Sequence, residues 1–202
     1  YEQTIPATAK AAHDAGKAWV LDPVGLGIGS LRTKLLSELK PYKPTIVRGN
    51  ASEIIALASL WELLDTEDAL DRPRGVDTTD GVDAAREAAV TLARYTGGAV
   101  VVSGEVDLVT DGATVVRSHG GSELMSKITG CGCSQGGVLA VYATCADAFT
   151  AAVAGTSHYN LAGTRAAAVA NAPASFKVAF IDELYRATGE EIAANPMCVE
   201  EA

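Results

Sequence analysis

Short, mostly apolar runs alternate with longer stretches of helical character along the first half of the chain. Three of these runs have the length and composition of buried strands in a parallel sheet: residues 18–21, 44–47 and 99–102. The predicted helices around them are residues 4–17, 31–39, a segment that begins near Ala51, and 84–95. Because strands and helices alternate, we predict a largely parallel sheet that is covered by helices on both faces.

The second half of the chain begins with a hairpin pattern and then becomes rich in helices. Val106–Thr110 and Ala113–Arg117 flank Asp111-Gly112, a dipeptide suited to a two-residue turn, and we place this hairpin at the sheet edge. Later helices are predicted at residues 138–154, 162–170 and 175–186. Residues 65–83 are polar and contain Pro, Gly, Asp and Thr, which predicts a surface loop.

Length and composition restrict the class of protein. The 202 residues, 48% of them hydrophobic, suffice for one substantial core and predict a single domain over residues 1–202. Acidic side chains outnumber basic ones 25 to 16, and Lys and Arg do not cluster, so we expect no nucleic-acid partner. Apolar stretches stay below the roughly 20 residues that span a membrane, and no secretion signal opens the chain. We therefore expect a cytoplasmic protein without a membrane partner.

The cysteines are too few and too irregularly spaced for a disulfide framework, which predicts free thiols. They are Cys131, Cys133, Cys145 and Cys198. The pair Cys131-x-Cys133 could be half of a zinc site, but His13, His119 and His158 are scattered and no second pair is present. Disulfide exchange would more naturally use Cys-x-x-Cys, which the chain lacks. Neither role is expected.

Polar side chains directly follow the predicted strands. Asp22 follows the first strand, Arg48, Asn50 and Glu53 follow the second, and Ser103 follows the third. In open parallel sheets, ligands bind where loops leave the carboxyl ends of the strands. These five residues are therefore candidates for one site.

A glycine-rich element, Thr129–Cys133, precedes a helical stretch. Its two glycines allow the backbone to approach a ligand, and the first N–H groups of a helix lack partners within the helix. Together with the helix dipole, such a turn can bind an anion such as a phosphoryl group. The alternative is a turn that only packs a helix against the sheet.

The order of four motifs resembles the hydroxyethylthiazole kinase family. The motifs are LDPVG at Leu21–Gly25, VRGNASEI at Val47–Ile54, SGEVDLVTDG at Ser103–Gly112 and TGCGC at Thr129–Cys133. Related ribokinase-like enzymes end the glycine-rich element with Asp, where this family has Cys. The resemblance implies a ribokinase-like three-layer α/β/α fold with a mostly parallel central sheet. The usual N-terminal strand-helix units precede the region that this chain matches.

The same resemblance implies ATP-dependent phosphorylation of 4-methyl-5-(2-hydroxyethyl)thiazole in thiamin salvage. The γ-phosphoryl group would lie over the amides of Gly130 to Cys133, including Gly132, and the thiazole alcohol would lie beside Gly130 and Cys133. A helix N-terminus can lower the pKa of a thiol from its usual value near 8.5, so Cys133 is the candidate base. Alternatively, Cys133 only fills space at a helix start. Phosphoryl transfer depends more on positioning of the reactants than on a base. Substitution of Gly130 or Gly132 should therefore reduce the rate at least as much as substitution of Cys133.

Nucleotide contacts are implied for several of the candidates. Arg48 would bind phosphates with its planar, permanently charged group, although a surface ion pair is the alternative. Ser103 stands where the family usually has a Thr that contacts the nucleotide. Thr129 and Cys131 complete the cradle, and the family usually has Thr at the position of Cys131.

Magnesium is the expected metal because the resemblance implies Mg-ATP. Asp22 and Glu53 supply oxygen ligands that could hold Mg²⁺ directly or through water. Each could instead cap a helix, especially Glu53, which lies near a helix start. Asn50 could orient Glu53 or a metal-bound water, but an Asn in a turn is more often structural.

The resemblance also implies a homotrimer with active sites between subunits. Two rival functions remain: a related kinase that acts on hydroxymethylpyrimidine or another small alcohol, and a catalytically silent subunit that keeps the trimer surface. The family's Gly-Pro-Gly-Ser-Phe becomes Ala172–Phe176 here, and the polar loop from Asp65 is longer than usual. Because the chain starts after the family's N-terminal units, the thiazole pocket is predicted less firmly than the nucleotide site.

Overall fold

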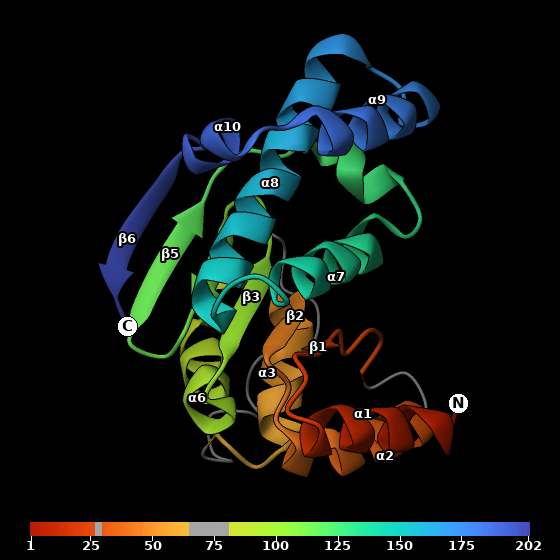
Figure 1. The fold of residues 1–202 in the computed structure, drawn as a ribbon, viewed down its shortest axis with the longest axis vertical. Coiled ribbons are helices and arrows are strands. Elements are labelled where there is room, and N and C mark those ends of the chain that lie inside the picture. The colour runs from red at the N-terminus through yellow and green to blue at the C-terminus, as the bar shows by residue number, and fades with distance from the viewer. Residues whose placement is uncertain (27–29, 65–80) are drawn as a thin grey trace.

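The computed structural model describes residues 1–26, 30–64 and 81–202, and within them a six-stranded sheet lies between layers of helices (Figure 1). The strands follow one another across the sheet in sequence order: β1 (Val20–Leu21), β2 (Ile46–Asn50), β3 (Ala99–Ser103), β4 (Asp107–Thr110), β5 (Thr114–Ser118) and β6 (Met197–Glu201). Pairing is parallel from β1 to β3 and antiparallel from β3 to β6. Strands β1, β2, β3 and β5 thus run the same way, in agreement with the predicted mostly parallel sheet.

Helices cover both faces of this sheet, as the alternating pattern predicts. They are α1 (Thr4–Asp14), α2 (Ser30–Leu39), the 3-10 helix η1 (Lys40–Tyr42), α3 (Ala51–Leu60), α5 (Gly81–Ala84), α6 (Arg86–Thr96), the 3-10 helix η2 (Glu123–Lys127), α7 (Cys131–Tyr142), α8 (Ala148–Val169), α9 (Pro173–Arg186) and α10 (Gly189–Ala193). Helices α2, α3 and α6 pack on one face, and α7 and α8 pack on the other (Figure 1). The three-layer α/β/α architecture is confirmed.

The alternation of side chains along each strand divides the core between the two faces. Val47 and Val100 pack with α3 and α6, whereas Ile46 and Val101 pack with α7 and α8. Arg48 lies two residues after Ile46 on β2, so its side chain faces the α7 layer. This placement brings a buried cation beneath the helix that follows the glycine-rich element.

The predicted hairpin exists, but two details of the prediction are wrong. Thr110 pairs with Val115, so residues 111–114 form a four-residue connection and not a two-residue turn. The Asp111 carboxylate accepts hydrogen bonds from the amides two and three residues later, at 2.9 and 2.7 Å, which stabilises the wider loop. The hairpin also does not lie at the sheet edge, because β6, which the hydrophobic pattern did not reveal, pairs with β5.

The helices after the glycine-rich element begin and end elsewhere than predicted. The pattern placed them at 138–154 and 162–170, but α7 already begins at its first cysteine and α8 is continuous through the supposed break. A Cβ on Gly155 would lie 2.8 Å from the Leu139 side chain, so this glycine allows α8 to approach α7 and does not end a helix. The true break precedes Asp147, whose side chain caps α8.

The predicted polar loop at 65–83 lies mostly outside the described residues. Only its last three residues are described, and they belong to α5. Among the helices within the described ranges, none has the length and apolar character needed to cross a membrane.

Candidate active site

Arg48 lies at the centre of the candidate site, where its guanidinium joins elements that are far apart in the sequence. Nη1 donates to Asp22 Oδ2 after β1 at 3.4 Å, and Nη2 donates to Ser103 Oγ at the end of β3 at 2.9 Å. Nε donates to Gln135 Oε1 on α7 at 3.0 Å. Only 8% of the residue is exposed, so the ion pair with Asp22 is largely buried and not the surface pair considered from the sequence.

Asp22 has a buried oxygen that could bind a ligand at this site. Its Oδ1 atom is buried and has no hydrogen-bond partner among the described residues. Burial raises the pKa of this carboxyl above its ordinary value, while the Arg48 guanidinium lowers it and the Glu53 carboxylate raises it further. A buried carboxylate oxygen without a donor is costly, and a bound cation would satisfy it.

Glu53 supports the loop after β1, and the cap considered from the sequence is present. Its Oε2 accepts from the Asn50 amide at 2.9 Å, and Asn50 Oδ1 accepts from the Glu53 amide at 2.9 Å, which completes a capping box at the start of α3. The other oxygen, Oε1, accepts from the Gly25 amide at 3.3 Å. Asn50 therefore has the structural role considered for it, and Glu53 links α3 to the Asp22 loop.

The glycine-rich element forms the start of α7. Gly130 is the N-cap, with a left-handed φ of 85° that favours glycine. The Cys131 amide donates to the Ile128 carbonyl at 3.2 Å. The amides of Gly132 and Cys133, by contrast, have no acceptor in the part of the chain that the structure describes. Within the predicted phosphate-binding turn, these two amides are therefore available to bind an anion. They lie at the positive end of a 12-residue helix.

Gly132 is in close contact with Arg48. A Cβ added to Gly132 would lie 3.0 Å from Arg48 Nη2 and 3.2 Å from Nη1, so only glycine fits here without moving the guanidinium. The neighbouring Thr129 and Cys133 side chains are exposed. The structure therefore brings the turn next to Arg48, and through it to Asp22 and Ser103, as the motifs predict.

Tyr159 is a component of the site that sequence reasoning missed. This α8 residue is 2% exposed, and its hydroxyl donates to the Cys131 carbonyl in the first turn of α7. The same hydroxyl lies 2.7 Å from Ser134 Oγ and 3.6 Å from Cys131 Sγ. Burial raises the pKa of the Tyr159 hydroxyl and of the Cys131 thiol above their ordinary values. Tyr159 thus fixes the first turn of α7 to α8.

A second missed group, Asp107, fixes the loop after Ser103. Asp107 Oδ1 accepts from the Gly104 amide at 2.8 Å, and Oδ2 accepts from Asn160 Nδ2 at 3.1 Å. Burial raises its pKa to about 6. Asn160 also donates to Ser118 Oγ at 3.1 Å. Tyr159 and Asn160 are adjacent on α8. One turn of this helix therefore holds both the first turn of α7 and, through Asp107, the loop after Ser103.

Comparison with known proteins identifies the family. The chain matches the hydroxyethylthiazole kinase family over residues 1–190. It is 45% identical to a hydroxyethylthiazole kinase of Bifidobacterium longum over 218 residues, which covers 99% of this chain and 69% of that protein. The chain belongs to the hydroxyethylthiazole kinase family. A second family member, from Bifidobacterium animalis subsp. lactis, is 48% identical and is matched over 98% of this chain and 68% of its own length.

Solved structures place the family within the ribokinase-like fold. A hydroxyethylthiazole kinase protein from Pyrococcus horikoshii superposes with a TM-score of 0.82 at 27% identity, over 100% of this chain and 72% of that chain. A pyridoxal kinase from Staphylococcus aureus, solved with AMP-PCP and pyridoxal, has a TM-score of 0.54 at 18% identity over 82% of this chain and 59% of that chain. The second likeness shows the fold alone, and the family assignment makes this chain a kinase.

Proposed function

We propose that the protein transfers the γ-phosphoryl group of ATP to the hydroxyl of 4-methyl-5-(2-hydroxyethyl)thiazole. Family membership supports the reaction class. The single structural observation that supports it best is the contact between Gly132 and Arg48. This contact places Gly132, whose amide has no acceptor among the described residues, directly beside a buried guanidinium, and the Cys133 amide follows it in the chain. Clustered N–H donors of this kind suit phosphoryl oxygens.

Each polar group at the site has a proposed role in positioning the reactants. The Gly132 and Cys133 amides bind oxygens of the phosphoryl group, and Gly130 and Thr129 shape the turn that presents them. Toward the residues that the structure describes, the Arg48 guanidinium uses three of its five donors, and one N–H on each terminal nitrogen is proposed to bind the nucleotide phosphates.

Cys133 is the proposed proton acceptor because its exposed thiol stands at the end of this turn. The acceptor hydroxyl attacks the γ-phosphorus, the bond from that phosphorus to the bridging oxygen breaks, and ADP leaves. The hydroxyl proton passes to Cys133, which accepts it as a thiolate and becomes a thiol. Gly130 and Cys133 border the thiazole alcohol, while Ser103 and Cys131 line the nucleotide side.

The residues present fit a magnesium ion. Mg²⁺ commonly binds through one or two carboxylates, with the remaining positions taken by water and phosphate oxygens. The buried Oδ1 of Asp22 supplies one such ligand, and Glu53 lies close enough to raise the pKa of Asp22. Because both Glu53 oxygens already accept backbone amides, we propose that Glu53 acts through a metal-bound water. When bound, the ion would neutralise phosphate charge.

A homotrimer is the proposed assembly, with active sites between subunits. Three exposed apolar residues of α9, Val178, Ile181 and Tyr185, recur at helical spacing and offer an apolar surface for subunit contact. Sedimentation equilibrium should therefore give three times the chain mass of 20.7 kDa. A monomer at micromolar concentration would contradict this proposal without affecting the proposed reaction.

A coupled ADP-release assay tests the function by offering the thiazole alcohol and hydroxymethylpyrimidine in parallel. We expect turnover of the thiazole alcohol, a loss of roughly 10² in kcat for Cys133→Ala, and little change for the matched variant Cys145→Ala, whose cysteine is also exposed. Asp22→Asn should raise the magnesium concentration needed for half-maximal rate. Activity only on the pyrimidine would reject the substrate, and the absence of turnover with both alcohols would favour a silent subunit.

A further inference from the structure

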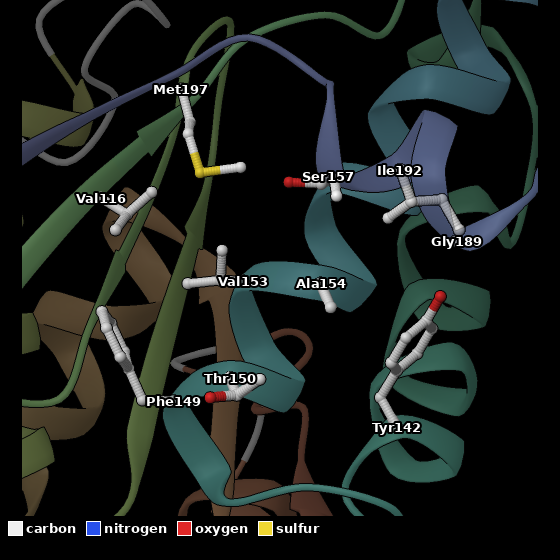
Figure 2. A pocket seen from close by; sticks show the side chains of 11 residues that line it. Val116, Tyr142, Phe149, Thr150, Val153, Ala154, Ser157, Gly189, Ile192 and Met197 are labelled. Carbon is white, nitrogen blue, oxygen red and sulfur yellow. The ribbon is translucent and has the colours of Figure 1, made fainter.

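An apolar pocket of about 410 Å³ lies between α8, α10 and the β5–β6 edge of the sheet (Figure 2). Its lining residues are Val116, Tyr142, Phe149, Thr150, Val153, Ala154, Ser157, Gly189, Ile192, Ala193 and Met197. The volume falls within the range of about 300–1,000 Å³ that small-molecule sites occupy. None of these lining residues is charged, so the pocket suits an uncharged molecule.

Ser157 gives this pocket a specific recognition point. The residue is 1% exposed, and its Oγ atom has no hydrogen-bond partner among the residues that the structure describes. A serine within a helix usually donates to a backbone carbonyl of the preceding turn, but this one does not. Figure 2 shows the hydroxyl directed toward Met197. A buried donor without an acceptor is unfavourable, and an acceptor on a ligand would satisfy it.

The part of the pocket wall formed by Tyr142 is held in place by hydrogen bonds. His158 Nε2 lies 2.9 Å from the Leu184 carbonyl, which can only accept, so Nε2 donates. In the neutral ring, Nδ1 then accepts from the Tyr142 hydroxyl at 3.0 Å. The ring of Tyr142 therefore stands fixed at the pocket wall, and its position does not depend on a ligand.

The pocket lies across α8 from the groups that hold the candidate active site. Ser157 and Tyr159 are two residues apart on one helix, so their side chains point about 200° apart around the helix axis. Tyr159 contacts the first turn of α7, whereas the pocket is lined by Tyr142, which is the last residue of the same helix. The 12 residues of α7 span about 18 Å.

We propose that this pocket is a second ligand site, which binds a small, uncharged and mostly apolar molecule with one hydrogen-bond acceptor. The acceptor meets the Ser157 hydroxyl, and the apolar part fills the space bordered by Val116, Val153 and Ile192. The proposal is independent of the proposed phosphoryl transfer, because it uses none of the residues assigned to that reaction.

A matched pair of probes tests the proposal: acetophenone, which carries a carbonyl acceptor, and isopropylbenzene, which has a similar shape without one. Methyl chemical shifts of Val116, Ile192 and Met197 report on binding. We expect both probes to shift these signals saturably, with acetophenone binding about 3- to 10-fold more tightly, as one hydrogen bond provides. Saturating ATP should leave the affinity for acetophenone unchanged.

Three variants separate the hydroxyl from the cavity. Ser157→Ala should bind both probes with equal affinity, because the donor is lost and the apolar space is retained. Thr156→Val removes a neighbouring buried hydroxyl that also lacks a partner in the described chain but does not line the pocket, so it should preserve the preference. Ala154→Phe should prevent binding of both probes by filling the cavity.

Several results would overturn the proposal. Absence of saturable shifts with both probes would show that the pocket does not take small molecules, and a change in oligomeric state in Ala154→Phe would then indicate that a second copy covers it. Competition by ATP would assign the pocket to the nucleotide site and not to a second ligand. An unchanged preference in Ser157→Ala would remove the recognition point. None of these results bears on thiazole turnover.

Discussion

Replacing Gly132 by Ala tests the contact on which the proposed site depends. The new Cβ would lie 3.0 Å from Arg48 Nη2, where ordinary contacts begin near 3.4 Å, so the guanidinium must move by a few tenths of an ångström. Its hydrogen bonds to Gln135 and Ser103, at 3.0 and 2.9 Å, resist that movement. Weakening one hydrogen bond of a charged group costs about 1.5–3 kcal/mol, which corresponds to a loss of about 10- to 100-fold in kcat/KM for ATP.

Stability should respond differently from activity, and this difference makes the test specific. Alanine inside a helix is favoured over glycine by about 0.5–1 kcal/mol, which offsets part of the strain in Gly132→Ala. The matched control is Gly137→Ala on the same helix, where a Cβ meets nothing within 4 Å. We expect the control to be fully active and slightly more stable in urea denaturation. Wild-type kcat/KM in Gly132→Ala would refute the reasoning.

Two further predictions concern the groups that hold the site from α8. Tyr159→Phe removes the bonds to the Cys131 carbonyl and to Ser134, so it should lower the free energy of unfolding by about 1–2 kcal/mol and raise KM for ATP. The control variant Tyr1→Phe, at a residue that is 95% exposed, should change neither quantity in parallel assays. Asp107 has a pKa of about 6 in the folded state and an ordinary value of 3.8. Between these two pH values the carboxyl is protonated in the folded state but not in the unfolded state. The free energy of unfolding therefore rises as the pH falls from about 6 to 3.8. Urea denaturation should show wild type gaining roughly 3 kcal/mol relative to Asp107→Asn between pH 6.5 and 3.5, and parallel curves would contradict the assignment.

Local sequence determined much of the fold because the early strands and helices carry their own signals. Mostly apolar runs of four residues predict β2 and β3, and the left-handed φ of Gly130 is one that glycine adopts readily. The order of polar residues after these strands predicted that Asp22, Arg48 and Ser103 would meet. They do meet, although Arg48 lies within β2 and Ser103 is the last residue of β3, whereas both were predicted to follow their strands. Parallel pairing places β1, β2 and β3 side by side, so the three side chains reach one site.

Contacts between distant segments decided the rest, because no local pattern encodes them. Gly155 looks like a helix break until its packing against Leu139 is known, and β6 becomes a strand by pairing with β5. In the sequence, Tyr159 resembles an ordinary core residue, and Asp107 resembles an ordinary polar residue of the predicted hairpin. Their roles depend on α8 crossing above the sheet, where burial raises their pKa values and leaves few partners for their polar atoms. The sequence thus determined which residues could form the site, and tertiary packing determined what holds them there.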